Sequence, residues 1–151
     1  TEHDWAQVLP GGKRLLVQDW HNSIADAELA VLDLATGVST PVIQGLYGRY
    51  VTTGHVVYAT STGSLMRVAF DPSAGKVTGA PIAIAEQVQI DGSSGSAQFS
   101  VSDNGSLSVR GGGRVRSTPS AVFSITRGGT HSSATPSRSP KTYAASASPG
   151  V

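Results

Sequence analysis

The histidines and serines are the residues of this chain that could support catalysis or metal binding. The four histidines, His3, His21, His55 and His131, lie far apart and show neither HxH nor HExxH spacing. The chain also has no cysteine, so a thiolate metal site cannot form. His55 stands in a predicted turn, where a role as a turn residue is a simpler interpretation than a role as a ligand. The sequence therefore predicts no metal site and no cofactor.

Two short segments match catalytic motifs only in part. Gly92–Ser96 reads GSSGS and lacks the final glycine of the GxSxG motif, which places a nucleophilic serine on a sharp turn. Ser73–Lys76 reads SAGK and has the SxxK spacing, but a predicted hairpin turn cannot place Ser73 and Lys76 on one helix face. We expect both segments to be loops, and we expect no catalytic residue in this chain.

The polar segment DWHNSIAD, residues 19–26, is the best candidate for a binding surface. Loops that join strands often carry binding residues, and Trp is frequent where protein partners make strong contacts. Asp19, Trp20 and His21 are therefore the predicted contact residues. In the alternative interpretation, Trp20 packs between two layers of the protein.

The elements that position these residues are predicted to be β-strands. Of the 151 residues, 38% are hydrophobic and only 14% are charged, and the chain contains 18 glycines. Short apolar runs are bounded by Gly, Pro and Asn, as in antiparallel strands joined by tight turns. No apolar run approaches the roughly 18 residues that a membrane helix needs, so we expect no membrane segment. The sequence leaves open whether the protein is cytoplasmic or extracytoplasmic.

The charged residues are distributed unevenly along the chain, whose net charge is +1. All 10 acidic residues lie at or before Asp103, and six of the 11 basic residues follow it. A basic segment can bind nucleic acid. Here, however, the six charges are spread widely and are accompanied by only two aromatic residues, Phe123 and Tyr143. We therefore do not expect nucleic acid to be the partner.

A four-strand unit recurs along the chain. The units start near residues 8, 50 and 97, and their first turns carry Gly12, Gly54 and Gly105, which are 42 and 51 residues apart. Repeats of roughly 40 to 50 residues with four short strands are typical of β-propeller blades. Pro41 and Pro81 fall in the fourth strand of their units, which suits the edge of a blade. We predict antiparallel four-stranded blades of an incomplete β-propeller, about three in number, with a β-sandwich as the alternative.

Two stretches carry a resemblance to known propellers. VLPGGKRLLV followed by AELAVLDLATG is similar to the opening turn and third strand of TolB-like repeats, which are relatives of WD repeats. The stretch from RYVTTGHVVYAT to SLSV resembles the C-terminal propeller region of bacterial serine/threonine protein kinases. The resemblance implies a partial propeller over residues 1–109. In residues 110–151 it implies a degenerate end of the third blade and a tail rich in Ser, Thr, Gly and Arg, whose low apolar content predicts disorder.

The resemblance also implies a function, namely a non-catalytic interaction or sensing module whose partner is a protein, a peptide or a small ligand. The kinase signatures HRD and DFG are absent from the sequence. Closed propellers use about four to eight blades, so we expect the chain to be part of a larger bacterial protein or to oligomerise, which would cover its open faces. Two alternatives stay open: an accessory propeller of a prolyl oligopeptidase-type hydrolase, and a small serine hydrolase.

Overall fold

Strands form all the elements in the part of the chain that the structure describes. The computed structural model describes residues 2–103, 105–110, 121–124 and 135–136, and over these residues it contains thirteen strands and no helix. No helix long and apolar enough to cross a membrane is therefore present within these ranges. The prediction of an all-β fold is confirmed.

The first sheet has four antiparallel strands in chain order. They are β1 (Glu2–Val8), β2 (Arg14–Trp20), β3 (Glu28–Asp33) and β4 (Ser39–Gln44). The apolar runs LLV and AVL lie in β2 and β3, and Leu16, Val17 and Ala30 within them are buried. Pro41 lies exposed in the edge strand β4, where the lack of a backbone N–H donor is tolerated.

The second sheet has five strands, and its outer edge differs from the prediction. The strands are β5 (Leu46–Val51), β6 (His55–Ala59), β7 (Leu65–Asp71), β8 (Lys76–Val77) and β9 (Ile82–Ala85). β8 pairs with the C-terminal end of β7, whereas β9 pairs with its N-terminal half. The predicted single fourth strand is therefore divided in two. The division falls at Gly79 and Pro81, residue types that interrupt regular strand pairing.

The third sheet again has four antiparallel strands in chain order. They are β10 (Phe99–Val101), β11 (Ser106–Val109), β12 (Ala121–Ser124) and β13 (Thr135–Pro136). The three sheets thus begin at Glu2, Leu46 and Phe99, where the repeat predicts units that start near residues 8, 50 and 97. Apart from Arg110 and the strands β12 and β13, the predicted tail over residues 110–151 lies outside the described residues.

The turn between the first two strands has the same geometry in each sheet. In each turn the glycine N–H donates a hydrogen bond to the carbonyl oxygen three residues earlier, at 3.0, 2.9 and 2.9 Å for Gly12, Gly54 and Gly105. All three glycines have positive φ, at 67°, 85° and 85°, which glycine adopts without steric strain. Gly12, Gly54 and Gly105 therefore occupy the same place in their turns.

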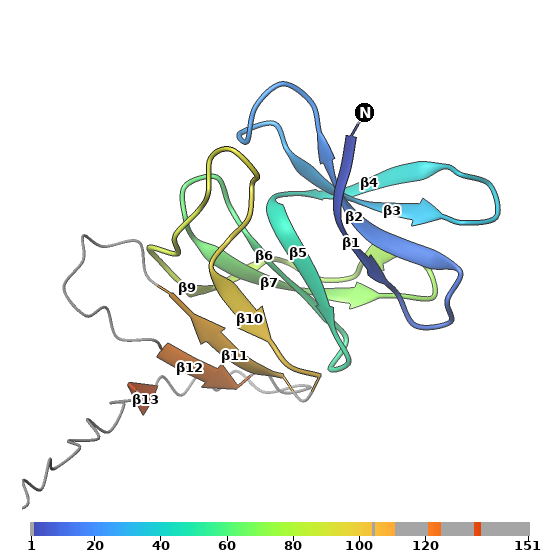
Figure 1. Cartoon of the computed structure of the whole chain (residues 1–151). Helices are drawn as coiled ribbons and strands as arrows, with labels where there is room; N and C mark the ends of the chain where they lie inside the picture. Colours follow the sequence, from blue (N-terminus) through green and yellow to red (C-terminus); the bar gives the residue numbers. More distant parts are fainter. Residues whose placement is uncertain (1, 104, 111–120, 125–134, 137–151) are drawn as a thin grey trace, which may run out of the picture.

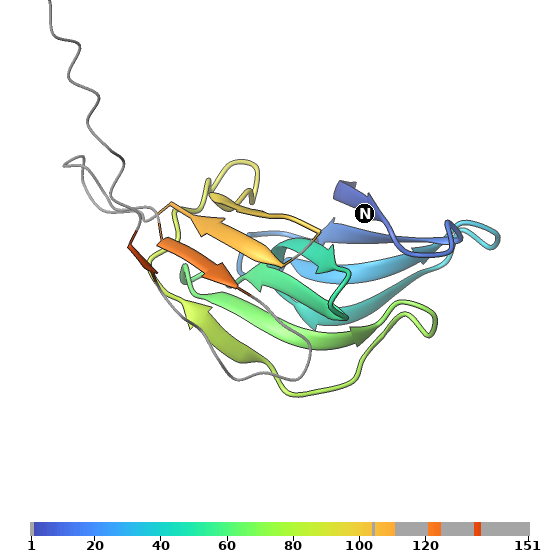
Figure 2. The same cartoon turned by 90° about the horizontal axis from the view of Figure 1, so that it is seen from below.

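The three sheets pack face to face, with the second sheet between the other two (Figure 1 and Figure 2). One core lies between the first and second sheets and includes Leu16, Leu29, Val31, Val56, Val68 and Phe70. Another lies between the second and third sheets and includes Leu46, Val57, Leu65, Phe99, Leu107 and Val109. The run VVYA, residues 56–59, is buried throughout because β6 stands in the middle sheet and is covered on both faces. This packing brings the first strands β1, β5 and β10 side by side near the centre (Figure 1).

Candidate functional site

The first strands of the first and second sheets share an irregular backbone. In β1 and in β5 the pairing register shifts around one aromatic residue, Trp5 and Tyr47 respectively. Both residues have positive φ, at 55° and 51°. A bulky residue rarely adopts this conformation, which stores on the order of 1–3 kcal/mol of strain. Trp5 and Tyr47 are 42 residues apart, as are Gly12 and Gly54, so the same distortion recurs at the same place in both sheets.

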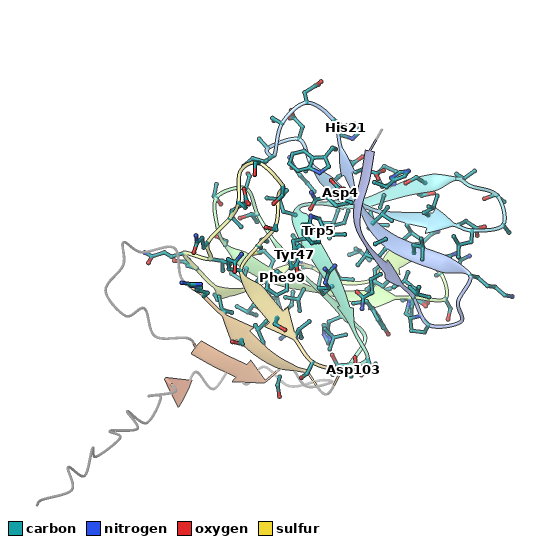
Figure 3. All side chains as sticks on the ribbon, viewed as in Figure 1. Asp4, Trp5, His21, Tyr47, Phe99 and Asp103 are labelled. Carbon is teal, nitrogen blue, oxygen red and sulfur yellow. The ribbon has the colours of Figure 1, made fainter. Side chains whose placement is uncertain are left out.

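The two distorted residues belong to a row of three aromatic rings, one from each sheet. The centroids of the Trp5 and Tyr47 rings are 4.9 Å apart and their planes meet at 75°. The centroids of the Tyr47 and Phe99 rings are 5.3 Å apart and their planes meet at 85°. Both contacts have the edge-to-face geometry that aromatic pairs prefer. Figure 3 shows the three labelled rings following one another from β1 through β5 to β10.

Arg49 holds the strained part of this row in place. Its guanidinium lies 4.3 Å from the centroid of the Tyr47 ring, within the range of a cation–π interaction. Its Nη1 atom donates hydrogen bonds to the carbonyl oxygens of Trp5 and Gly48, both at 3.0 Å. The indole Nε1 of Trp5 donates to the carbonyl oxygen of Ser94 at 3.1 Å. Trp5 is therefore fixed by polar contacts from outside its own strand, whereas Arg49 contacts the Tyr47 ring from within β5.

Two glutamines satisfy the backbone of β5 on the side where it has no neighbouring strand. The Tyr47 N–H donates to Oε1 of Gln18 at 2.7 Å. The Tyr50 N–H donates to Oε1 of Gln7 at 2.7 Å, and Nε2 of Gln7 donates back to the Tyr50 carbonyl oxygen at 3.0 Å. An edge strand leaves backbone groups that need partners. These side-chain amides supply them and join the second sheet to the first.

The aromatic row borders a cavity of about 350 Å³, which we call the aromatic cavity. Its lining residues are Trp5, Tyr47, Ser96, Ala97, Gln98, Phe99, Ser100, Ser108 and Arg110. Arg110 is the one charged residue in this set, and none is acidic. Among the described residues, the cavity thus combines aromatic edges, hydroxyl and amide groups and the cation of Arg110. Small-molecule and side-chain binding sites have this mixture of apolar walls and a few polar groups.

The polar wall of the aromatic cavity follows from the alternation of side chains in the third sheet. Phe99 and the neighbouring strand residue Val109 are buried against the second sheet. Ser100 pairs with Ser108 and both are exposed, so they lie on the opposite face. Arg110 lies two residues after Ser108, so it follows the same alternation of exposed and buried residues, and it is also exposed. The described parts of β10 and β11 therefore carry a polar, positively charged face beside the aromatic row.

Of the three contact residues predicted from the sequence, Asp19 and Trp20 are the last residues of β2 and His21 follows it, and none lines the aromatic cavity. Asp19 is only 4% exposed and its carboxylate is bonded to the His3 ring. His21 is exposed and its Nε2 lies 3.1 Å from the Glu28 carboxylate, apart from the aromatic row (Figure 3). The role of Asp19, Trp20 and His21 in binding stays a prediction.

Trp20 lies against the loop that precedes β10. A Cβ atom added to Gly95 would lie 2.7 Å from the Trp20 ring and 2.6 Å from Nε2 of Gln18. Gly95 also has a φ of 64°, which other residues rarely adopt. The backbone at Gly95 therefore approaches Trp20 and Gln18 so closely that only glycine fits without movement. A contact of this kind is expected in the alternative interpretation of the sequence, in which Trp20 packs between two layers of the protein.

The histidines and acids do not form a metal site within the described ranges. No group of three His, Asp or Glu side chains is close enough there to hold a metal ion. His55 contacts Thr53 and Arg67, each at 3.3 Å. Partial burial, and then the positive charge of Arg67, lowers the pKa of His55 below its usual value. His131 lies outside the described residues.

Sequence reasoning missed the residues of the aromatic row. Each of the first two turn glycines is preceded by an aromatic residue at a distance of seven positions, Trp5 before Gly12 and Tyr47 before Gly54. That shared spacing is visible in the sequence and could have identified both residues. Phe99 does not follow it, because it lies six positions before Gly105. Its membership of the row becomes visible only in three dimensions.

Comparison of the chain with known protein families, curated proteins and solved structures returned no match. The aromatic cavity is the place where backbone strain, aromatic rings from different sheets and the charge of Arg110 meet.

Proposed function

We propose that this chain is a non-catalytic interaction or sensing module of the TolB-like propeller type, and that its ligand binds in the aromatic cavity. The observation that carries the proposal is the row Trp5–Tyr47–Phe99, to which each of the three sheets contributes one ring beside a cavity of about 350 Å³. The proposed partner is a protein or peptide segment, or a small ligand of similar size.

The order and packing of the sheets support the propeller part of the proposal. Three antiparallel sheets follow one another along the chain, each built from consecutive strands, and they pack as three layers. A β-sandwich has two layers. The first strands lie together, while Pro41 lies in an outer edge strand. This arrangement resembles neighbouring blades around an axis, as in the propeller region of bacterial serine/threonine protein kinases.

The strain at the aromatic row supports the binding part of the proposal. Two bulky residues at positive φ destabilise the fold, and they persist because Arg49 and Gln18 hold them. Strained residues held in this way cluster at ligand sites, where they keep contact groups in place before the ligand arrives. The Trp5 side chain is also 38% exposed, although Trp is normally much more buried.

The described residues give the serine hydrolase alternative less support. They contain two histidine–carboxylate pairs, His3 with Asp19 and His21 with Glu28. Within the described ranges neither histidine has a hydrogen bond to a serine, which a nucleophile and its general base would share. An accessory propeller of a prolyl oligopeptidase-type enzyme would work together with a separate hydrolase domain, and the neighbouring coding sequence would reveal it.

A paired selection experiment tests the proposal. The immobilised chain selects ligands from a peptide-display library and from a set of small molecules, in parallel with a Tyr47→Leu variant. The control variant is Tyr50→Leu, since Tyr50 lies on the same strand but does not line the cavity. We expect wild type and Tyr50→Leu to share ligands that Tyr47→Leu does not bind. Failure to obtain any ligand that depends on Tyr47, with all three proteins folded by circular dichroism, would overturn the proposal.

A further inference from the structure

We infer that the ligand of the aromatic cavity is an extended peptide that carries an aromatic side chain next to an acidic one. The inference rests on the proposed function, because it names the chemistry of the ligand for the same site. Three properties of the cavity lead to it: its size and aromatic border, its charge, and its row of hydroxyl and amide groups.

The size and border favour a single large side chain. Ligand pockets usually enclose roughly 300–1,000 Å³, so a cavity of about 350 Å³ is at the small end of the range. Trp5, Tyr47 and Phe99 already meet edge to face. A further ring can join such a cluster in the same geometry and gain more than an aliphatic side chain would. An aromatic side chain is therefore the best match for the apolar part.

The charge of the cavity selects against a cationic ligand. Clusters of aromatic rings bind ammonium groups in many proteins, but here Arg49 already lies over the Tyr47 ring and Arg110 lines the cavity. None of the described lining residues is acidic, so none of them offsets these charges. A lysine or methyl-lysine side chain would be repelled, whereas a carboxylate can form a bidentate ion pair with an arginine. The side chain next to the aromatic one is therefore acidic.

The polar groups beside Arg110 suit the backbone of an extended peptide. Gln98, Ser100 and Ser108 line the cavity and are exposed. Ser100 and Ser108 lie on the same face of β10 and β11, and Gln98 directly precedes β10. Their amide and hydroxyl groups can both donate and accept hydrogen bonds, as the amide and carbonyl groups of a peptide require. Residues on this face are spaced along two strands, so they match a ligand that is itself extended rather than helical.

The test uses fluorescence anisotropy with four labelled, end-capped peptides: GGFDDGG, GGADDGG, GGFKKGG and GGFNNGG. We expect GGFDDGG to bind wild type at least tenfold more tightly than the lysine peptide and several-fold more tightly than the alanine and asparagine peptides. Affinity for GGFDDGG should fall as NaCl is raised, because the ion pair with Arg110 is exposed to solvent.

Three variants connect the binding to the cavity. Arg110→Gln should weaken GGFDDGG about threefold to tenfold and leave GGFNNGG unchanged, because only the acidic peptide uses the charge. Tyr47→Leu should weaken both. Arg67→Gln is the matched control, since it removes one arginine that contacts His55 outside the cavity lining, and it should leave every affinity unchanged.

The outcomes separate this inference from the proposed function. Tighter binding of GGFKKGG than of GGFDDGG, or an unchanged affinity for GGFDDGG in Arg110→Gln, overturns the inference. If none of the four peptides binds but the selection described above yields ligands that depend on Tyr47, the inference fails and the proposed function stands. If the selection also yields no such ligand, both fail.

Discussion

The backbone N–H of Tyr47 donates a hydrogen bond of 2.7 Å to the side-chain oxygen of Gln18, which belongs to the neighbouring sheet and is completely buried. The bond joins a residue with strained backbone to a side chain that solvent does not reach. An unsatisfied backbone donor in such a position is energetically unfavourable. Gln18 therefore supports both the packing of the sheets and the position of the Tyr47 ring.

Replacing Gln18 by leucine should destabilise the protein by about 1–3 kcal/mol, since the partly buried Tyr47 N–H would lose its acceptor. The measurement is urea unfolding followed by circular dichroism. Gln89→Leu is the matched control, because the Gln89 side chain is exposed, and it should change stability by less than about 0.5 kcal/mol. Equal effects of the two substitutions would contradict the role assigned to Gln18.

Glycine should stabilise the protein relative to alanine at position 47, although glycine normally weakens a strand. The φ of Tyr47 is 51°, which disfavours alanine by roughly 1 kcal/mol relative to glycine. Comparing the Tm of Tyr47→Gly with that of Tyr47→Ala measures the difference. At Tyr50, which is not among the residues with positive φ, the order should be reversed. If glycine and alanine rank in the same order at both positions, the positive φ of Tyr47 is contradicted.

Substitution of Gly95 by alanine should destabilise the protein by about 1–3 kcal/mol, in the range of overpacked cores. The new methyl group would lie 2.6 Å from Nε2 of Gln18 and 2.7 Å from the Trp20 ring. The control is Gly92→Ala in the same loop, where a Cβ atom meets nothing within 4 Å. Thermal unfolding gives the stability, and tryptophan fluorescence of the folded state reports the displacement of Trp20. If Gly95→Ala changes neither the stability nor the tryptophan fluorescence, the close approach of Gly95 to Trp20 and Gln18 is refuted.

Stability should decrease when the pH falls below about 6.5, partly because of His55. Partial burial and the charge of Arg67 lower the pKa of this histidine, so the folded protein binds a proton less readily than the unfolded chain. The contribution of His55 to stability is fully present above its pKa in the unfolded chain. It is lost as the pH falls towards the lower pKa of His55 in the folded protein. Arg67→Gln should raise the His55 pKa and make the decline smaller. An NMR titration of the His55 ring gives the pKa directly, and an unshifted value in wild type would remove this explanation.

The turns and the buried strands could be predicted from the sequence because they depend on local chemistry. A glycine at positive φ closes each first turn at Gly12, Gly54 and Gly105, and the run at residues 56–59 is apolar throughout because it is covered on both faces. These signals lie within a few residues of the structure they determine. The positions of the inner strands β2, β3, β6 and β7 follow from them, whereas the divided outer strand of the second sheet does not.

The aromatic cavity could not be predicted in the same way. Trp5, Tyr47 and Phe99 are separated by more than forty residues along the chain, and their contact depends on how three sheets pack. The burial of Asp19 is a second example, since a polar segment between strands suggests exposure. Its carboxylate is instead covered and bonded to His3, whose strand lies beside β2. Both features depend on partners distant in sequence.

The glutamine contacts to β5 also affect how copies of this protein meet one another. A free strand edge can template the addition of strands from other molecules, which leads to fibres and precipitates. Gln7 occupies both the N–H and the carbonyl group of Tyr50, and Gln18 occupies the N–H of Tyr47. A strand from another molecule therefore cannot pair with this stretch of β5. The side chains of Gln7 and Gln18 thus protect this protein, which is rich in β-structure, against aggregation.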